Sequence, residues 1–207
     1  LEFVYNLCTN SLKKIKALYS TSIYKQKNNN NLFAKDGAIY KMEYPLNTNN
    51  IEKSATKIDN VYNKYLKGMN VYYAIIPDKN YYLENDDHLK FDYNELKEIM
   101  ANKLTNFKYI DIWDSLELED YYYTDTHWKQ EKLQKVLDKI ANQMNFKDRL
   151  KTKFELKEIT NFKGVYSGQL PLDTKEDTIK VLTNNIIETS KVYNYETNKE
   201  TKIYDLD

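Results

Sequence analysis

Apolar residues recur every three or four positions in four stretches of the chain, and this spacing predicts four amphipathic helices. Asn49, followed by Glu52, is placed to cap the second helix, and Gly68 is placed to end it. Asp92, followed by Glu95, opens the third helix in the same way. The predicted helices cover residues 2–19, 50–67, 93–104 and 128–144.

Two strand-like runs alternate with these helices, and the first of them is continuously apolar. Residues 71–76 end at Pro77, and residues 107–113 follow the third helix. A run that is apolar on both sides suits a strand covered on both faces, as in a parallel sheet. Residues 71–144 therefore predict a β–α–β unit with a right-handed crossover, followed by a helix.

Antiparallel strands are predicted on either side of this unit. Residues 32–40 form a candidate hairpin with Asp36-Gly37 as its turn. After residue 150, short β-type runs alternate with polar turns. We therefore predict an α/β domain at residues 1–150 and a β-rich, antiparallel appendage at residues 151–207. The runs of the appendage are residues 154–159, 178–182, 186–195 and 201–204.

Charge and composition argue against some classes of function for this chain. The chain has 31 Lys and Arg residues and 31 Asp and Glu residues, so its net charge is zero. Nucleic-acid binding normally needs a positive excess, and we therefore expect no nucleic-acid partner. No apolar run reaches the roughly 18 residues of a transmembrane helix. Cys8 is the one cysteine, so no internal disulfide can form.

Asp125 and His127 are the strongest candidates for chemistry. Residues two apart in an extended segment point to the same side, so Asp125 could accept the Nδ1 hydrogen of His127. The Nε2 atom would then be free to act as a base, as in a nucleophile–His–Asp triad. The alternative is a histidine that packs beside a helix start, with Asp125 as a helix-start carboxylate.

Several other residues are weaker candidates. Lys79 follows a predicted strand and either faces the site or is a solvated turn residue. The adjacent tyrosines could line a saccharide groove, and Trp128 is either a core anchor or a substrate platform. Asp86-Asp87-His88 is a poor metal site, because consecutive residues rarely converge on one ion. We expect no metal and no cofactor.

The segment Tyr122-Tyr123-Thr124-Asp125-Thr126-His127-Trp128 resembles the signature of the DHHW proteins, which are similar to the SGNH-hydrolase-like domains of the alginate O-acetyltransferase group. Thr126 replaces the first histidine of that name. Three further segments match in order: Lys35-Asp36-Gly37, Pro77-Asp78-Lys79 and Phe162-Lys163-Gly164. The resemblance implies an α/β fold with a partial SGNH/flavodoxin-like parallel sheet and flanking helices, before the antiparallel β appendage.

In the family that the chain resembles, the Asp-x-His pair works with a serine in a later Gly-Asp-Ser or Lys-Asp-Ser motif. Neither motif occurs in the 207 residues. Ser115 lies before Asp125, and Ser167 follows Tyr166 in the aromatic-x-Gly segment, so both match poorly. We therefore expect the chain, whether truncated or naturally without the serine, to be catalytically poor by itself.

The resemblance implies an extracytoplasmic, cell-surface domain of a polysaccharide O-acetylation system, which transfers or hydrolyses acetyl esters. His127 and Asp125 would be catalytic, and a membrane-bound acyl-transfer protein would be the partner. The expected substrate contacts are Lys79, Tyr122, Tyr123 and Trp128. The alternative is a non-catalytic carbohydrate-binding or assembly protein on the same scaffold, which the missing serine favours.

Overall fold

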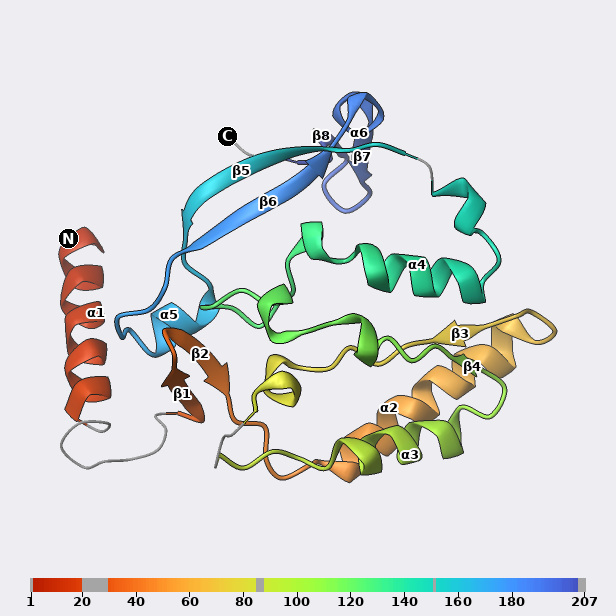
Figure 1. Ribbon diagram of the computed structural model, residues 1–207, viewed down its shortest axis with the longest axis horizontal. Helices are drawn as coiled ribbons and strands as arrows, with labels where there is room; N and C mark the ends of the chain where they lie inside the picture. Colours follow the sequence, from red (N-terminus) through yellow and green to blue (C-terminus); the bar gives the residue numbers. More distant parts are fainter. Residues whose placement is uncertain (1, 20–29, 85–87, 151, 205–207) are drawn as a thin grey trace.

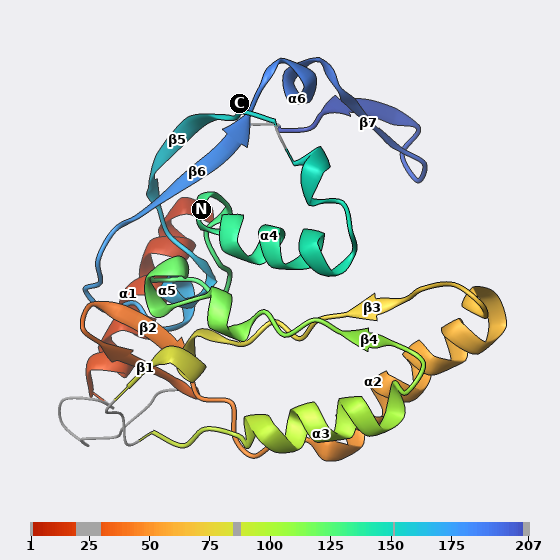
Figure 2. The same ribbon diagram turned by 45° about the vertical axis from the view of Figure 1, so that its right-hand side comes forward.

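A short parallel strand pair lies between helices on both of its sides (Figures 1 and 2). The computed structural model describes residues 2–19, 30–84, 88–150 and 152–204. Strands β3 (Tyr72–Tyr73) and β4 (Lys108–Tyr109) pair in parallel, with α2 and α3 on one side and α4 on the other. The helices are α2 (Thr48–Val61), α3 (Tyr93–Lys103) and α4 (Gln134–Gln143). The fold is therefore mixed α/β, as predicted.

The parallel pairing is much shorter than the apolar runs that predict it. In both runs the regular strand is two residues long, and the described residues form no wider parallel sheet. After Tyr73 the first run leaves the sheet: Ile76 is 59% exposed, and the Ile75 carbonyl accepts a hydrogen bond from Trp113 Nε1 at 2.8 Å. A side chain thus takes the place of the neighbouring strand.

The core of this unit surrounds Trp113, which is buried against the first turns of α4. Its buried members are Ile110, Ile112, Trp113, Leu116 and Val136, and Trp128 packs against them from the loop before α4. Large apolar side chains that meet from strands and helix hold the layers together. Trp128 is thus partly buried and takes the place of a core anchor.

Helix ends follow local capping chemistry, and two of the predicted helix starts are displaced. Asn47, not Asn49, caps α2: its side chain accepts from the Asn50 amide at 3.0 Å. Gly68 has a positive φ of 85° and follows a π-helical turn, Tyr62–Leu66, that continues α2. Asp92 caps α3 as predicted. The predicted helix 128–144 begins later, because α4 is preceded by a 3₁₀ turn, Gln130–Lys132.

At the N-terminal side, α1 (Glu2–Leu18) packs beside a β-hairpin and a short helix, α5 (Val165–Gln169). Strands β1 (Leu32–Lys35) and β2 (Ala38–Lys41) pair antiparallel, and both turn residues, Asp36 and Gly37, have positive φ as predicted for a two-residue turn. The shared core contains Ala17, Leu32, Ile39, Tyr166 and Leu170. Residues 20–29, between α1 and this hairpin, lie outside the described residues.

The C-terminal part is built from antiparallel pairs, as predicted. Strand β5 (Glu155–Phe162) pairs with β6 (Asp177–Thr183), and β7 (Lys191–Asn194) pairs with β8 (Lys199–Lys202). The strand predicted at residues 186–195 is wrong in its first half, because Asn184 caps a short helix, α6 (Asn185–Thr189), there. The remaining 3₁₀ turns are Lys79–Tyr82, Trp113–Ser115, Leu118–Asp120 and Lys147–Arg149.

No helix in the described part of the chain combines the length and the apolar character needed to cross a membrane. The start of β6 and the start of α5 both return to the segment between β4 and α4, which carries Asp125 and His127. The division predicted after residue 150 is therefore crossed by hydrogen bonds at this segment.

Candidate active site

Residues 121–128 form a narrow loop closed by main-chain hydrogen bonds. Tyr121 and Trp128 form an antiparallel bridge, and the Tyr122 amide donates to the His127 carbonyl at 3.2 Å. The Lys129 amide donates to the Asp120 carbonyl at 2.7 Å at the base of the loop. The loop, called the Asp-x-His loop below, is therefore closed at its base by its own backbone.

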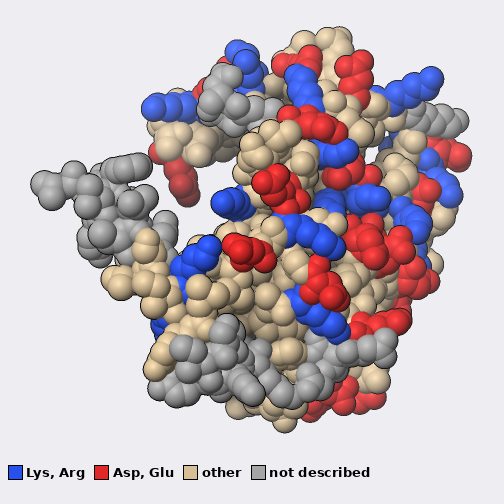
Figure 3. All heavy atoms as spheres, turned by 60° about the vertical axis from the view of Figure 1, so that its left-hand side comes forward, with Lys and Arg blue, Asp and Glu red and all other residues tan. Residues whose placement is uncertain are grey.

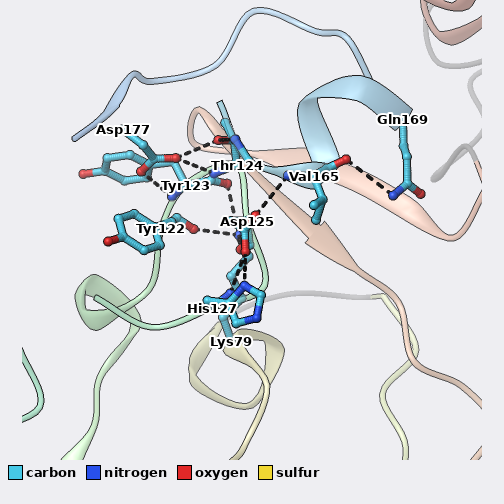
Figure 4. A network of polar contacts seen from close by, with 10 residues as sticks. Lys79, Tyr122, Tyr123, Thr124, Asp125, His127, Val165, Gln169 and Asp177 are labelled. Atoms are coloured by element: carbon cyan, nitrogen blue, oxygen red, sulfur yellow. Dashed lines mark hydrogen bonds and ion pairs between the residues drawn. The ribbon is translucent and has the colours of Figure 1, made fainter. Parts of the chain in front are cut away.

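Asp125 and His127 are in direct contact within this loop (Figure 4). His127 Nδ1 lies 2.6 Å from Asp125 Oδ1, which also accepts from the His127 amide at 3.0 Å. A carboxylate can only accept, so the imidazole donates from Nδ1 and its Nε2 carries the lone pair. The side chain of Asp125 is 5% exposed and that of His127 is 75% exposed. The imidazole is therefore oriented by a buried carboxylate and exposes its basic nitrogen to solvent.

The second oxygen of Asp125 is held by the start of α5. The Val165 amide donates to Asp125 Oδ2 at 3.0 Å. Burial by itself would raise the pKa of Asp125, but the donors from Val165 and His127 outweigh it and lower the pKa below its usual range. Asp125 is therefore an anion in the folded protein at neutral pH, as an orienting carboxylate must be.

Gly164 allows this close approach. A Cβ atom at position 164 would lie 2.4 Å from both Asp125 Cβ and the Thr124 carbonyl oxygen. No side chain fits at that distance, so glycine is required for the α5 segment to reach the carboxylate. The aromatic-x-Gly segment that the sequence singled out is thus packed directly against Asp125.

Lys79 is buried beneath the loop, with 4% of its surface exposed. Its Nζ donates to the carbonyls of Tyr122 and Tyr123 at 3.0 Å and of Asp125 at 3.1 Å. An ammonium has three N–H donors, and all three are used by the loop main chain. The solvated alternative is therefore wrong. Through these contacts Lys79 stabilises the loop. A contact between Lys79 and a substrate stays a prediction.

The Lys79 ammonium is placed among opposite charges and aromatic rings. Burial lowers the pKa of Lys79 to about 8, although Asp177 and Asp125 pull it back upwards. The Nζ atom lies 5.0 Å from the Tyr40 ring centroid and 5.4 Å from that of Tyr166, within the range of a cation–π contact. Rings and carboxylates thus offset part of the desolvation cost of this buried cation.

Asp177, the first residue of β6, holds the opposite side of the loop and is 2% exposed. Its Oδ1 accepts from the Tyr123 amide at 2.8 Å, and its Oδ2 accepts from the Thr124 amide at 2.8 Å and from Thr124 Oγ1 at 2.7 Å. Asp177 could not be found from sequence, because nothing in its local pattern points to a partner 53 residues away.

The aromatic candidates of the loop face different surroundings. Tyr122 is buried, and its ring lies edge-on to Phe162 at 5.3 Å. Burial raises the pKa of Tyr122 to about 12. Tyr123 is half-buried between Lys129 and Lys175, whose Nζ atoms each lie 5.1 Å from its ring centroid. Tyr123 is thus flanked by two positive charges. The substrate contacts predicted for Lys79, Tyr122, Tyr123 and Trp128 all remain predictions.

Neither serine weighed in the sequence analysis touches the imidazole. Ser115 Oγ donates to Asp114 at 3.2 Å, and Ser167 Oγ is buried without a hydrogen-bond partner in the described structure. Among the described residues no three His, Cys, Asp or Glu side chains are grouped as metal ligands. Asp86 and Asp87 lie outside those residues, and the His88 ring stacks on Phe33 at 3.6 Å.

A groove of about 690 Å³ borders the loop on the side of α1. Figure 3 turns the side of the molecule that carries α1 forward and shows basic and acidic side chains intermingled over it. The groove is lined by apolar and polar residues together, including Lys14, Phe162, Leu172 and Thr174. Thr124 and Gly164 also line it, so the groove and the Asp125 carboxylate share a wall.

No family model matches the chain, and no curated protein does. Two solved structures share the fold. PatB1 of Bacillus cereus has a TM-score of 0.60 and 17% identity over 83% of this chain. A DHHW family protein from Eubacterium siraeum has a TM-score of 0.56 and 18% identity over 75% of it. The chain spans 65% and 55% of those two chains. The chain therefore has the fold of PatB1 and of a DHHW family protein.

Proposed function

We propose that this chain carries the His–Asp part of a Ser-His-Asp acyl-transfer site. The observation that carries the proposal is the 2.6 Å contact between a buried Asp125 carboxylate and a largely exposed His127 ring. This is the arrangement that a general base needs: its tautomer is fixed on one side, and its reactive nitrogen is open on the other. The fold shared with PatB1 and a DHHW protein supports it.

In the proposed reaction, His127 Nε2 takes the proton of a serine hydroxyl as the hydroxyl oxygen attacks the carbonyl carbon of an acetyl ester. The acetyl–oxygen bond of the donor breaks, and the imidazolium returns the proton to the leaving alkoxide. A sugar hydroxyl or water then accepts the acetyl group by the same steps. Asp125 stabilises the imidazolium throughout. Neither Ser115 nor Ser167 is the nucleophile.

The setting of the reaction is drawn from the family that the chain resembles. We propose a polysaccharide as the acetyl acceptor, a membrane-bound acyl-transfer protein as the partner that delivers acetyl groups, and a site of action outside the cytoplasmic membrane. Within the SGNH-like scheme, Asp125 and His127 are the catalytic residues. Tyr123 and Trp128, which are both partly exposed, are the loop residues proposed to contact the substrate.

The first experiment is an acetyl-ester assay. A polypeptide that joins this chain to a Gly-Asp-Ser or Lys-Asp-Ser segment should turn over acetyl esters, and the 207-residue chain alone should not. His127→Ala should lower turnover by on the order of 10⁴-fold or more, because the hydroxyl loses its base. His88→Ala, at the only other histidine, is the matched control and should keep activity.

Circular dichroism must show that each variant is folded. Equal activity of a folded His127→Ala variant would overturn the proposed role of the imidazole. A serine-dependent rate that is lost in Ser115→Ala or Ser167→Ala would place the nucleophile elsewhere.

A binding role on the same scaffold is the second candidate, and the groove beside the loop favours it. Its mixed lining of aliphatic, aromatic and polar side chains suits a saccharide, whose ring faces are apolar and whose edges carry hydroxyls. Titration of the chain with neutral oligosaccharides should then shift the amide resonances of Phe162 and Thr174 without any turnover. Unchanged spectra at millimolar saccharide would exclude this candidate.

A further inference from the structure

We propose that Asp177 is a positioning residue for the Asp125–His127 pair, and that it acts through Thr124 and Gly164. The inference rests on the proposed function, because it assigns a role relative to that pair. Asp177 touches neither Asp125 nor His127 in any of its hydrogen bonds, which go to Tyr123 and Thr124. Its influence must therefore pass through the residues that it holds.

The path from Asp177 to Asp125 is a chain of hydrogen bonds. Thr124 Oγ1 donates to Asp177 Oδ2 at 2.7 Å and, with its lone pair, accepts from the Gly164 amide at 2.9 Å. A hydroxyl that donates in one direction and accepts in the other fixes both neighbours at once. The next amide, that of Val165, donates to Asp125 Oδ2 at 3.0 Å.

This path fixes the orientation of the Asp125 carboxylate relative to the imidazole. Because Val165 occupies Oδ2, Oδ1 faces His127 Nδ1. If the Thr124–Gly164 bond were lost, the Tyr166 amide would still hold α5 to the Thr124 carbonyl at 3.1 Å, but the Gly164–Val165 peptide could shift and Asp125 could rotate. The imidazole would then lose the partner that fixes its tautomer. Asp177 thereby sets the state of the base, although it lies outside hydrogen-bonding contact with it.

The loop is also held between two buried opposite charges. Lys79 binds loop carbonyls from one side, and Asp177 binds loop amides and a hydroxyl from the other. The positive Lys79 binds carbonyl oxygens, which carry partial negative charge, and the negative Asp177 binds amide hydrogens, which carry partial positive charge. A neutral amide at 177 could not accept all three donors with the same strength, because charge-assisted hydrogen bonds are roughly twice as strong as neutral ones.

The test reads the His127 ring and needs no turnover. Long-range proton–nitrogen spectra distinguish the two neutral imidazole tautomers, and the chain has only two histidines, so His88→Ala assigns the signals. The wild type should show the Nδ1–H tautomer for His127. Asp177→Asn and Thr124→Val should both shift it towards the Nε2–H tautomer. Thr124→Ser, which keeps the hydroxyl, should retain the wild-type spectrum.

Asp120→Asn is the matched control, since Asp120 is also a buried carboxylate bound to a main-chain amide, that of Glu117. It should lower the melting temperature and leave the tautomer unchanged. If Asp177→Asn fails to fold, the Thr124→Val and Thr124→Ser pair decides alone.

Two failures are distinguishable. An Asp125→Asn variant with an unchanged His127 tautomer would overturn the proposed function itself. A changed tautomer in Asp125→Asn, with wild-type spectra in Asp177→Asn and Thr124→Val, would overturn only the role of Asp177.

Discussion

At the scale of single residues, the site depends on a carboxylate that stays charged although it is buried. Both oxygens of Asp125 accept hydrogen bonds from amides, and one also contacts the imidazole. An ion removed from water is tolerated only when such donors replace its hydration. The hydrogen bonds that stabilise this anion form only in the folded chain, so the charge of Asp125 contributes to the free energy of folding.

The pH dependence of stability should reveal this coupling. The pKa of Asp125 is lowered from 3.8 in the fold, so at low pH the unfolded chain takes up the proton more readily than the folded one. The stability that the charge contributes is present above pH 3.8 and is lost as the pH falls through the folded pKa. The difference in unfolding free energy between the wild type and Asp125→Asn should shrink over that range, by at most about 1.4 kcal/mol per pH unit.

Urea denaturation of both proteins in steps from pH 7 to pH 3 measures this difference. A difference that stays constant over the whole range would contradict the lowered pKa.

A second residue-scale prediction concerns the contact at Gly164. Gly164→Ala places a methyl group 2.4 Å from Asp125 Cβ, so it should destabilise the fold by about 1–3 kcal/mol or more. Gly168→Ala is a close control in the same short helix, where the added Cβ meets nothing within 4 Å. It should be neutral or stabilising by up to about 1 kcal/mol. Thermal unfolding compares the two, and equal melting temperatures would contradict the close packing.

At the scale of elements, local patterns predicted which segments are helical better than where those helices begin. The run Asn47-Thr48-Asn49-Asn50 offers several capping residues in a row, and sequence pattern favours Asn49 because Glu52 follows. The structure uses Asn47, and α2 begins two residues earlier. Capping strength differs little between neighbouring asparagines, so the local sequence does not decide which of them is the cap.

Substitution of the two asparagines tests this assignment. Asn47→Ala should lower the unfolding free energy by about 1 kcal/mol, because the Asn50 amide loses its acceptor. Asn49→Ala, at an exposed position inside the helix, should change it by less than about 0.5 kcal/mol. Urea denaturation measures both, and the reverse order would return the cap to Asn49.

The site shows the same division between local and distant information. Asp125 and His127 could be paired from sequence, because residues two apart in a turning segment share a side. The burial of Lys79 and the contact of Asp177 could not, because both depend on how distant elements pack. A lysine after a strand reads as solvated until the loop carbonyls that it binds are known, and Asp177 reads only as the polar start of a strand.

At the scale of the whole molecule, the C-terminal strands and the α/β layers meet at one loop. Asp177 and Val165 lie in the part predicted as an appendage, and their partners Thr124 and Asp125 lie in the α/β part. Buried hydrogen bonds across this division link the stability of the two parts. We therefore expect the described elements to unfold together.

Two probes of equilibrium unfolding test this expectation. Both tryptophans, Trp113 and Trp128, lie before residue 150, so their fluorescence reports the α/β part, whereas far-UV circular dichroism reports the whole chain. The two transitions in urea should coincide, as in a two-state protein. A dichroism transition that continues after the fluorescence change is complete would instead support separate domains.

The anchoring of the Asp-x-His loop has a consequence for protein engineering. Lys79 grips only backbone atoms there, and two of the three bonds that Asp177 accepts also come from the backbone. The exposed Thr126 can therefore be varied while these backbone bonds stay in place, with the loss of its side-chain hydrogen bond to Tyr166, whereas Tyr123 packs against the core around Phe33 and is kept. A library at position 126 would vary the surface presented to a ligand beside His127 while the scaffold stays the same, which makes this position a natural place to begin redesign of specificity.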